Sequence, residues 1–165
     1  MSVSPETYRL AETLGERCRA RGVTVTAAES CTGGGVASAI TEVAGSSDYF
    51  GTGYVTYANE AKTRLLGVPE ALIAEHGAVS RGVVEAMVTG ACRDSGADLA
   101  VAISGVAGPG GGSPDKPVGT VWLAWSGPDR VRSECRHFPG DRRAVREQAV
   151  IAALEGLIAQ LEKRD

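Results

Sequence analysis

The fold of this chain can be predicted from one short segment, Val23-Thr-Val-Thr-Ala-Ala-Glu-Ser-Cys-Thr-Gly-Gly-Gly35. Its first six residues alternate branched side chains with a period of two, which is typical of a β-strand. The three glycines permit a tight turn, and residues 36–43 have the composition of a helix that Gly45 ends. The stretch therefore predicts a strand, a glycine turn and a helix, in that order.

The neighbouring segments continue this alternation of strands and helices. A helix-start signal at Ser4, Pro5 and Glu6 predicts a first helix that ends at Gly22. A second strand is expected over residues 53–57, with short helices opening at Asn59 and at 69–70, the latter ending near residue 77. Ser80 is expected to cap a longer helix with a core-facing stripe of Val83, Val84, Met87, Val88, Ala91 and Cys92.

The second half of the chain predicts the centre and one edge of the sheet. Residues 99–104 are continuously apolar, as in a strand buried on both faces. Residues 118–125 and 131–138 are joined by a segment too short for a crossover helix, so one strand must run antiparallel. Asp141 is expected to cap a final helix whose buried face carries Val145, Ala149, Ala152, Leu157 and Leu161.

Together these elements predict an α/β fold, a three-layer α/β/α single domain over residues 1–165. Its core is a mixed five-stranded sheet with one antiparallel strand.

The composition narrows the class of protein. The chain has 165 residues, of which 43% are hydrophobic and 22% charged, as in a soluble globular domain. A net charge of −3 argues against a surface built to bind nucleic acid. No apolar run approaches the roughly 20 residues that a membrane-spanning helix needs. The N-terminal residues do not resemble a secretory leader, so we expect a cytoplasmic protein.

The metal-binding and disulfide-forming residues are sparse. The four cysteines contain no C-x-x-C pair, and only His76 and His137 could assist them, so we expect no metal site. Reduced thiols are favoured over two disulfides at Cys18, Cys31, Cys92 and Cys135. We interpret His76, at the end of a short helix, and His137, on an outer strand, as structural.

The first turn is the strongest candidate for chemistry. A serine at the carboxyl end of a strand, followed by glycines and a helix start, combines a hydroxyl with unpaired N–H groups, as a nucleophile beside an oxyanion hole requires. The alternative is that Ser30 or Thr32 only caps the helix. Lys62 is the candidate base, because it follows the second strand at the same sheet edge; the alternative is an exposed lysine in a first helical turn.

Other ligand-binding motifs are absent or ambiguous. No G-x-G-x-x-G follows the first strand, and Tyr57 and Lys62 lack the spacing of short-chain dehydrogenases, which disfavours a nicotinamide-cofactor oxidoreductase. The glycine-rich loop 105–112 is no ATP P-loop and either wraps a ligand or forms a flexible crossover. Arg142 and Arg143 form either a phosphate clamp or a solvated charged face.

Five motifs in order resemble the competence/damage-inducible CinA C-terminal domain family. They lie at residues 28–34, 57–62, 76–80, 103–122 and 140–146, and the resemblance covers about residues 6 to 162. It implies hydrolysis of the carboxamide of nicotinamide mononucleotide (NMN) to nicotinate mononucleotide and ammonia, with no cofactor. Many members carry a further N-terminal domain, so this chain looks like the stand-alone form. The family usually self-associates, so a homo-oligomer is expected.

The resemblance also implies roles for individual residues. Ser30 would be the nucleophile and Lys62 the general base, with Tyr57 orienting the lysine or relaying the proton. The oxyanion would bind the N–H groups of Cys31, Thr32, Gly33 and Gly34, and the nucleotide would be held by Ser104, Gly105, Gly108 and Arg142. Two alternatives stay open: a non-catalytic nucleotide-binding or regulatory module, and an amidohydrolase for another small amide. A low-pKa thiol at Cys31 is a rival nucleophile.

Overall fold

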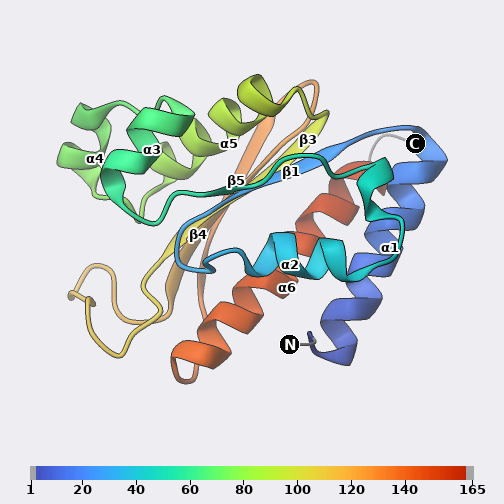
Figure 1. Ribbon diagram of the computed structural model, residues 1–165. Coiled ribbons are helices and arrows are strands. Elements are labelled where there is room, and N and C mark those ends of the chain that lie inside the picture. The colour runs from blue at the N-terminus through green and yellow to red at the C-terminus, as the bar shows by residue number, and fades with distance from the viewer. Residues whose placement is uncertain (1–2, 163–165) are drawn as a thin grey trace.

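A five-stranded mixed sheet runs through the centre of the computed structural model, which describes residues 3–162 (Figure 1). The strands lie in the order β2 (Tyr54–Val55), β1 (Val25–Glu29), β3 (Leu99–Gly105), β4 (Thr120–Ser126) and β5 (Val131–His137). β1 is parallel to both β2 and β3, whereas β4 is antiparallel to β3 and β5. β4 is therefore the one antiparallel strand, and the predicted fold class is confirmed.

Helices cover both faces of the sheet, which gives the expected three layers. Figure 1 shows α1 (Pro5–Arg21), α2 (Gly35–Glu42) and α6 (Arg142–Glu162) on one face. The other face carries α3 (Asn59–Leu66), α4 (Glu70–His76) and α5 (Arg81–Ser95). A short 3₁₀ helix, η1 (Ser46–Asp48), follows α2. Two apolar cores result, one between each helical layer and the sheet.

Burial across the sheet follows the sequence pattern. All residues of β1 are buried, and so are residues 99–104 of β3, because helices lie on both of their faces. The edge strand β5 is largely exposed or half-buried and carries charged side chains, which discourage pairing with another sheet.

Capping residues explain the start of α1, the end of α1 and the start of α6. The Ser4 hydroxyl accepts the Thr7 N–H (3.2 Å), and Gly22 ends α1 with a left-handed φ of 64°. Asp141 accepts the Ala144 N–H (2.9 Å) at the start of α6, as predicted. Ser80 precedes α5 as expected, but its hydroxyl donates to the Gly77 carbonyl instead of capping the helix.

The first two strands are shorter than their sequence patterns predict. β1 begins at Val25 instead of residue 23, and β2 comprises only Tyr54 and Val55 instead of residues 53–57. Directly after β2, the Thr56 N–H still donates to the Glu29 carbonyl of β1 (2.9 Å), while the carbonyls of Thr56 and Tyr57 accept from Lys62.

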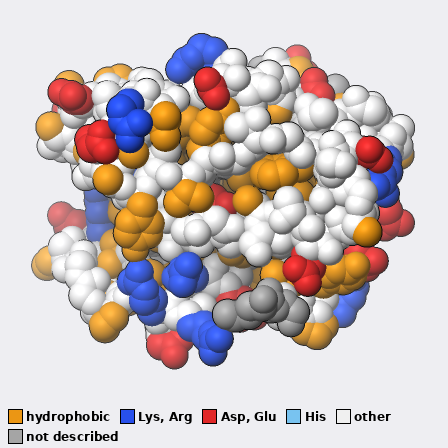
Figure 2. Space-filling view, viewed as in Figure 1, with side chains coloured by type: hydrophobic (Ala, Val, Ile, Leu, Met, Phe, Trp, Pro, Cys, Tyr) orange, Lys and Arg blue, Asp and Glu red, His pale blue; other side chains and the backbone are white. Residues whose placement is uncertain are grey.

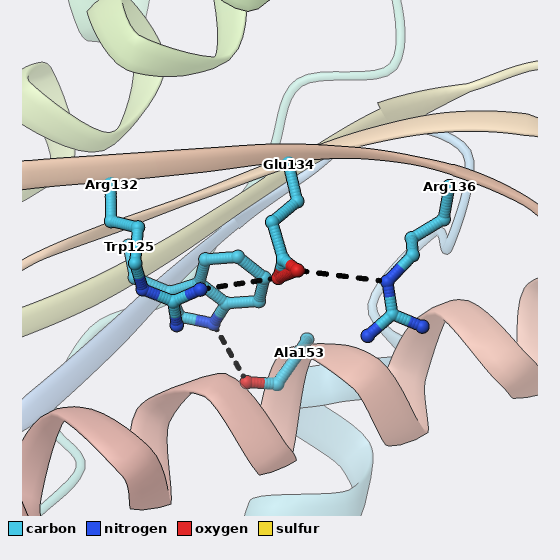
Figure 3. Close-up of polar contacts among 5 residues, drawn as sticks. All are labelled: Trp125, Arg132, Glu134, Arg136 and Ala153. Atoms are coloured by element: carbon cyan, nitrogen blue, oxygen red, sulfur yellow. Dashed lines mark hydrogen bonds and ion pairs between the residues drawn. The ribbon is translucent and has the colours of Figure 1, made fainter.

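A buried tryptophan joins β4 to α6 (Figure 3). The Trp125 indole N–H donates to the Ala153 carbonyl (3.0 Å), and the Arg132 guanidinium lies 4.3 Å from the centre of the Trp125 ring. Glu134 lies between Arg132 and Arg136 and pairs with both, at 3.1 and 3.8 Å. The bond from Trp125 to Ala153 holds the long helix α6 against the sheet, and the start of that helix reaches the site described next.

Candidate active site

The carboxyl ends of the three parallel strands meet at one edge of the sheet. Ser30 follows β1, Thr56 and Tyr57 follow β2, and Ser104 and Gly105 end β3. Ligands of open α/β sheets characteristically bind at this edge. The first turn of α6 also reaches it, because Arg142 donates to the Gly108 carbonyl (2.8 Å).

A buried lysine contacts the serine hydroxyl. Lys62 Nζ lies 3.1 Å from Ser30 Oγ, and the Lys62 side chain is fully buried. The ammonium also donates to the backbone carbonyls of Thr56 (2.8 Å) and Tyr57 (3.3 Å). Lys62 forms no ion pair with an acid within residues 3–162. The interpretation of Lys62 as an exposed lysine is therefore wrong.

Burial lowers the pKa of Lys62, because the charged ammonium loses its hydration. A nearby thiol, Cys31, opposes this shift weakly. The positive charge of Arg142 is not among the causes of this shift. Desolvation alone therefore moves this lysine towards the neutral form that a general base needs.

The thiol of Cys31, next to Ser30, has a raised pKa, whereas a nucleophilic cysteine requires a lowered one. Burial raises the pKa of Cys31 to about 11, and the charges of Arg146 and Arg142 reduce that shift without reversing it. Cys31 is therefore a neutral thiol near pH 7, so the arrangement favours the Ser30 hydroxyl over the thiol.

The glycine turn leaves backbone donors free beside Ser30. The Gly33 N–H is already bonded to the Ser30 carbonyl (3.0 Å), so it closes the turn and is not available to a ligand. Among the described residues, the N–H groups of Thr32 and Gly34 have no acceptor, and that of Cys31 meets only its own thiol sulfur. Gly33 (φ 56°) and Gly34 (φ 101°) both adopt left-handed conformations, which explains why the turn needs glycine.

Two residues without a predicted role hold this turn from outside. The buried Glu29 carboxylate accepts the Thr32 hydroxyl (2.6 Å) and the N–H groups of Val36 (2.9 Å) and Ala37 (3.0 Å) at the start of α2. Arg146, on α6, donates to the carbonyls of Cys31 (3.1 Å) and Thr32 (3.2 Å). An acid just before a helix start is a recognisable signal, whereas no local pattern links residues 31 and 146.

Tyr57 contacts the lysine through its backbone. Its carbonyl accepts from Lys62, while its hydroxyl accepts from Arg142 Nη2 (2.9 Å). The side chain is 57% exposed and lines the pocket. The structure thus brings Tyr57 to the site but directs its hydroxyl to an arginine.

A pocket of about 320 Å³ collects most of the predicted site residues. Its lining includes Ser30, Cys31, Tyr57, Ser104, Gly105, Gly108 and Arg142, and it also includes Asn59, Ala78 and Val79, which the sequence analysis did not select. Lys62 lies behind Ser30 and does not line the pocket, and neither do Thr32, Gly33 and Gly34.

A second pocket of about 690 Å³ adjoins the first and shares Ala107 and Arg142 with it. Arg143 and Arg146 also line it. Figure 2 shows basic side chains gathered at the lower left, where α6 begins. A hollow with an excess of positive charge therefore lies beside the serine and lysine.

The two histidines lie away from the Ser30–Lys62 pair. His76 ends α4, where its carbonyl accepts the Lys116 ammonium, and His137 is exposed on the edge strand β5. Within residues 3–162, no group of three or more His, Cys, Asp or Glu side chains is placed to hold a metal ion. Across the same residues, no helix has the length and apolar character needed to cross a membrane.

Residues 7–161 match the CinA C-terminal domain family. The chain belongs to this family. It is 66% identical over 149 residues to the nicotinamide-nucleotide amidohydrolase PncC of Pseudomonas putida, covering 90% of this chain and 93% of that protein. The protein of the same name from Escherichia coli K12 is 54% identical over 158 residues, covering 94% of each chain.

Other CinA-family relatives differ in length or are known as structures. A putative competence-damage inducible protein of Symbiobacterium thermophilum is 54% identical over 154 residues, and the match covers only 36% of that protein. The crystal structure of the competence/damage inducible protein CihA from Agrobacterium tumefaciens superimposes with a TM-score of 0.94 at 42% identity, covering 98% of this chain and 99% of that one. This match supports the fold described above.

Proposed function

We propose that this protein hydrolyses the carboxamide of NMN to nicotinate mononucleotide and ammonia, in pyridine nucleotide salvage. The names of the CinA-family relatives that match nearly their whole length support the substrate and the reaction. The buried contact of 3.1 Å between Lys62 Nζ and Ser30 Oγ carries the mechanism, because it pairs a hydroxyl with a desolvated amine that can take its proton.

In the first half of the reaction, Ser30 Oγ attacks the carboxamide carbon while neutral Lys62 Nζ accepts the hydroxyl proton. The carbonyl oxygen becomes an oxyanion, which the free N–H groups of Cys31, Thr32 and Gly34 are available to stabilise. Lys62 then donates the proton to the departing nitrogen, and ammonia leaves. The products of this half are an ester on Ser30 and neutral Lys62.

The second half repeats this proton transfer with water. Lys62 accepts a proton from water as the water oxygen attacks the ester carbon, and then returns a proton to Ser30 Oγ as the ester bond breaks. The released carboxylic acid loses its remaining proton to solvent, and the product is nicotinate mononucleotide. Tyr57 orients the lysine through its carbonyl, and its hydroxyl holds Arg142 in place at the pocket rim.

The charged part of the substrate fits the basic end of the site. Arg142 reaches the same pocket as Ser30 and borders the adjoining basic hollow, so we assign it to the nucleotide phosphate. Ser104, Gly105 and Gly108 line the pocket between these two points, where they are placed to contact the rest of the nucleotide.

The decisive experiment is to incubate purified protein with NMN and to quantify ammonia and nicotinate mononucleotide. Equal amounts of both products are expected from the wild type. Ser30→Ala should lose at least a thousandfold in kcat and should still bind NMN in calorimetry, since only the attacking atom is removed. Ser38→Ala, on α2, is the matched control and should retain full activity.

Two results would overturn the assignment. More than about a tenth of the wild-type activity in Ser30→Ala, a loss below roughly 1.4 kcal/mol, would exclude Ser30 as the nucleophile. A higher kcat/KM for another small amide than for NMN would replace the substrate, and no turnover of any amide would favour a non-catalytic binding module.

We extend the proposal to the setting of the enzyme: a single domain that works in the cytoplasm as a homo-oligomer. Light scattering on the purified protein tests the self-association directly, and a monomeric mass would reject that part of the proposal.

A further inference from the structure

Arg146 is the only described side chain outside the turn that donates to the carbonyls of the turn next to Ser30. Its Nε and Nη2 reach the carbonyls of Cys31 and Thr32, at 3.1 and 3.2 Å. The two donors of one planar guanidinium thus hold two successive peptide groups, which a single ammonium could not do with the same geometry.

Because the peptide group is planar, the direction of each carbonyl that Arg146 binds also fixes the direction of the N–H group in the same peptide. In a trans peptide, the carbonyl of one residue and the N–H of the next point in opposite directions. The one cis peptide among residues 3–162 joins Gly108 and Pro109, so the turn is trans throughout. Because the Cys31 carbonyl points at Arg146, the Thr32 N–H points away from Arg146.

The same argument fixes the neighbouring donor. The Ser30 carbonyl accepts the Gly33 N–H within the turn, so the Cys31 N–H points out of the turn. Within the described residues, the Thr32 N–H has no acceptor, and the Cys31 N–H meets only its own thiol sulfur, which is a weak acceptor. Two donors next to Ser30 are therefore held in a set direction without being satisfied.

We propose that Arg146 is the positioning residue for the oxyanion-binding N–H groups beside Ser30. It sets the Thr32 N–H directly through the Cys31 carbonyl, and it supports the Cys31 N–H through the Gly33 peptide, whose N–H binds the Ser30 carbonyl. This inference rests on the proposed function. By holding the carbonyls of the turn, Arg146 orients these donors before the substrate arrives, so no backbone rearrangement is needed when negative charge develops on the carboxamide oxygen. Arg146 itself does not contact the reacting atoms.

The turn has little freedom to reorient by itself while these contacts last. Glu29 fixes its other side through Thr32 and the start of α2. A side chain added at Gly33 would lie 3.3 Å from Arg146 Nη2, which shows how closely the guanidinium packs against the turn. Losing Arg146 removes the support on one side only, so the turn should stay folded but become less well oriented.

A competing role for Arg146 is direct binding of the substrate phosphate, because Arg146 also lines the basic hollow with Arg142 and Arg143. The two roles separate when the substrate loses its phosphate. Nicotinamide riboside carries the same carboxamide without that group. A positioning residue should affect both substrates equally, whereas a phosphate ligand should affect only NMN.

The test compares Arg146→Met and Arg146→Lys with the wild type on both substrates. We expect kcat of Arg146→Met to fall by about a hundredfold for NMN and for nicotinamide riboside alike, comparable with the loss of one oxyanion donor. KM should change by less than about threefold, as expected when only transition-state interactions are lost. Arg146→Lys should recover little, because it keeps the charge but loses the planar pair of donors.

Arg19→Met is the matched control, because Arg19 also donates to a loop carbonyl, that of Gly45 (2.9 Å), but on α1. It should retain wild-type kcat. An aldehyde analogue of NMN, which forms a tetrahedral adduct with a serine, provides a second measure: its affinity should fall with kcat/KM in Arg146→Met, while the affinity for the product nicotinate mononucleotide stays constant.

The outcomes distinguish a failure of the proposed function from a failure of the positioning role of Arg146. A wild-type protein that does not hydrolyse NMN overturns the proposed function. An active wild type together with an unchanged kcat in Arg146→Met overturns only the positioning role. A loss confined to NMN, expressed in KM and restored by Arg146→Lys, assigns Arg146 to the phosphate instead.

Discussion

An ammonium group without water around it holds its proton less tightly, and Lys62 is such a group. Its side chain is fully buried, and its partners are a hydroxyl and two carbonyls, which cannot supply the negative charge that would stabilise the ammonium. The burial that lowers the pKa also fixes Nζ at the Ser30 hydroxyl. One feature of the structure thus provides both the basicity and the position of the proposed base.

The lowered pKa of Lys62 determines how the rate should depend on pH. Because the neutral amine is the active form, kcat/KM should rise with pH through the pKa of Lys62 in the free enzyme. Burial lowers that pKa, so the rising limb should lie below the ordinary lysine value of about 10.4. A pH–rate profile from 6 to 10.5 checks this, and a limb that stays near 10.4 would contradict it.

Lys62→Arg distinguishes a lysine that accepts a proton from one that only supplies positive charge. Guanidinium keeps the positive charge but cannot give up its proton, so we expect a loss of at least a thousandfold in kcat. Lys163→Arg, the same substitution outside the described residues, is the control. If Lys62→Arg retained most of its kcat, the residue would supply only charge and another group would have to be the base.

Cys31→Ala tests whether the thiol of Cys31 takes part in catalysis. Since burial raises the thiol pKa to about 11, almost none of it is thiolate at pH 7, and its removal should leave kcat within about threefold of the wild type. Steady-state kinetics at pH 7 measure this. Complete loss of activity in a folded Cys31→Ala protein would reassign the nucleophile to sulfur.

At the scale of elements, the strand–turn–helix unit from β1 to α2 places the site. The conformation of Gly33 predicts that Gly33→Ala destabilises the protein by about 1 kcal/mol, because its φ of 56° disfavours any Cβ. The added methyl group also meets Arg146, so kcat should fall as well. Urea unfolding and steady-state kinetics measure the two effects.

Gly22→Ala is the matched control for this element. Gly22 has a similar φ of 64°, but nothing lies within 4 Å of its Cβ position, at the end of α1. It should lose similar stability and no activity. Equal activity losses in the two variants would mean that the effect of Gly33→Ala is global instead of local.

The elements differ in how far the sequence could predict them. Periodicity and capping signals located the six α-helices and five strands of residues 3–162, but not the 3₁₀ helix η1, because each of these signals depends on neighbours in the chain. The turn at Ser30 and the approach of Lys62 were predictable too, since parallel strands end at one edge of a sheet. The contact between Arg146 and Cys31 was not, because it joins residues 115 positions apart and depends on how α6 packs.

At the scale of the whole molecule, that packing depends on the contact of Trp125 with α6 (Figure 3). Gly156 lies against the indole ring, and a Cβ there would overlap it. Gly156→Ala should therefore destabilise the fold by about 1–3 kcal/mol, even though alanine is the better helix former. Trp125 pairs with Val101, towards the end of β3 remote from Gly105, so kcat per folded molecule should not change.

A double-mutant cycle measures this coupling between sheet and helix. Trp125→Phe alone should also cost about 1–3 kcal/mol, through the lost indole hydrogen bond and the smaller ring. The smaller ring leaves room for a methyl group at residue 156, so the double variant should be more stable than the sum of the single effects by about 1 kcal/mol or more. Urea unfolding of all four proteins gives the coupling energy. If the two single changes in the free energy of unfolding were strictly additive, α6 would have to move to accommodate the methyl group. In that case Gly156→Ala should also shift Arg146 and lower kcat.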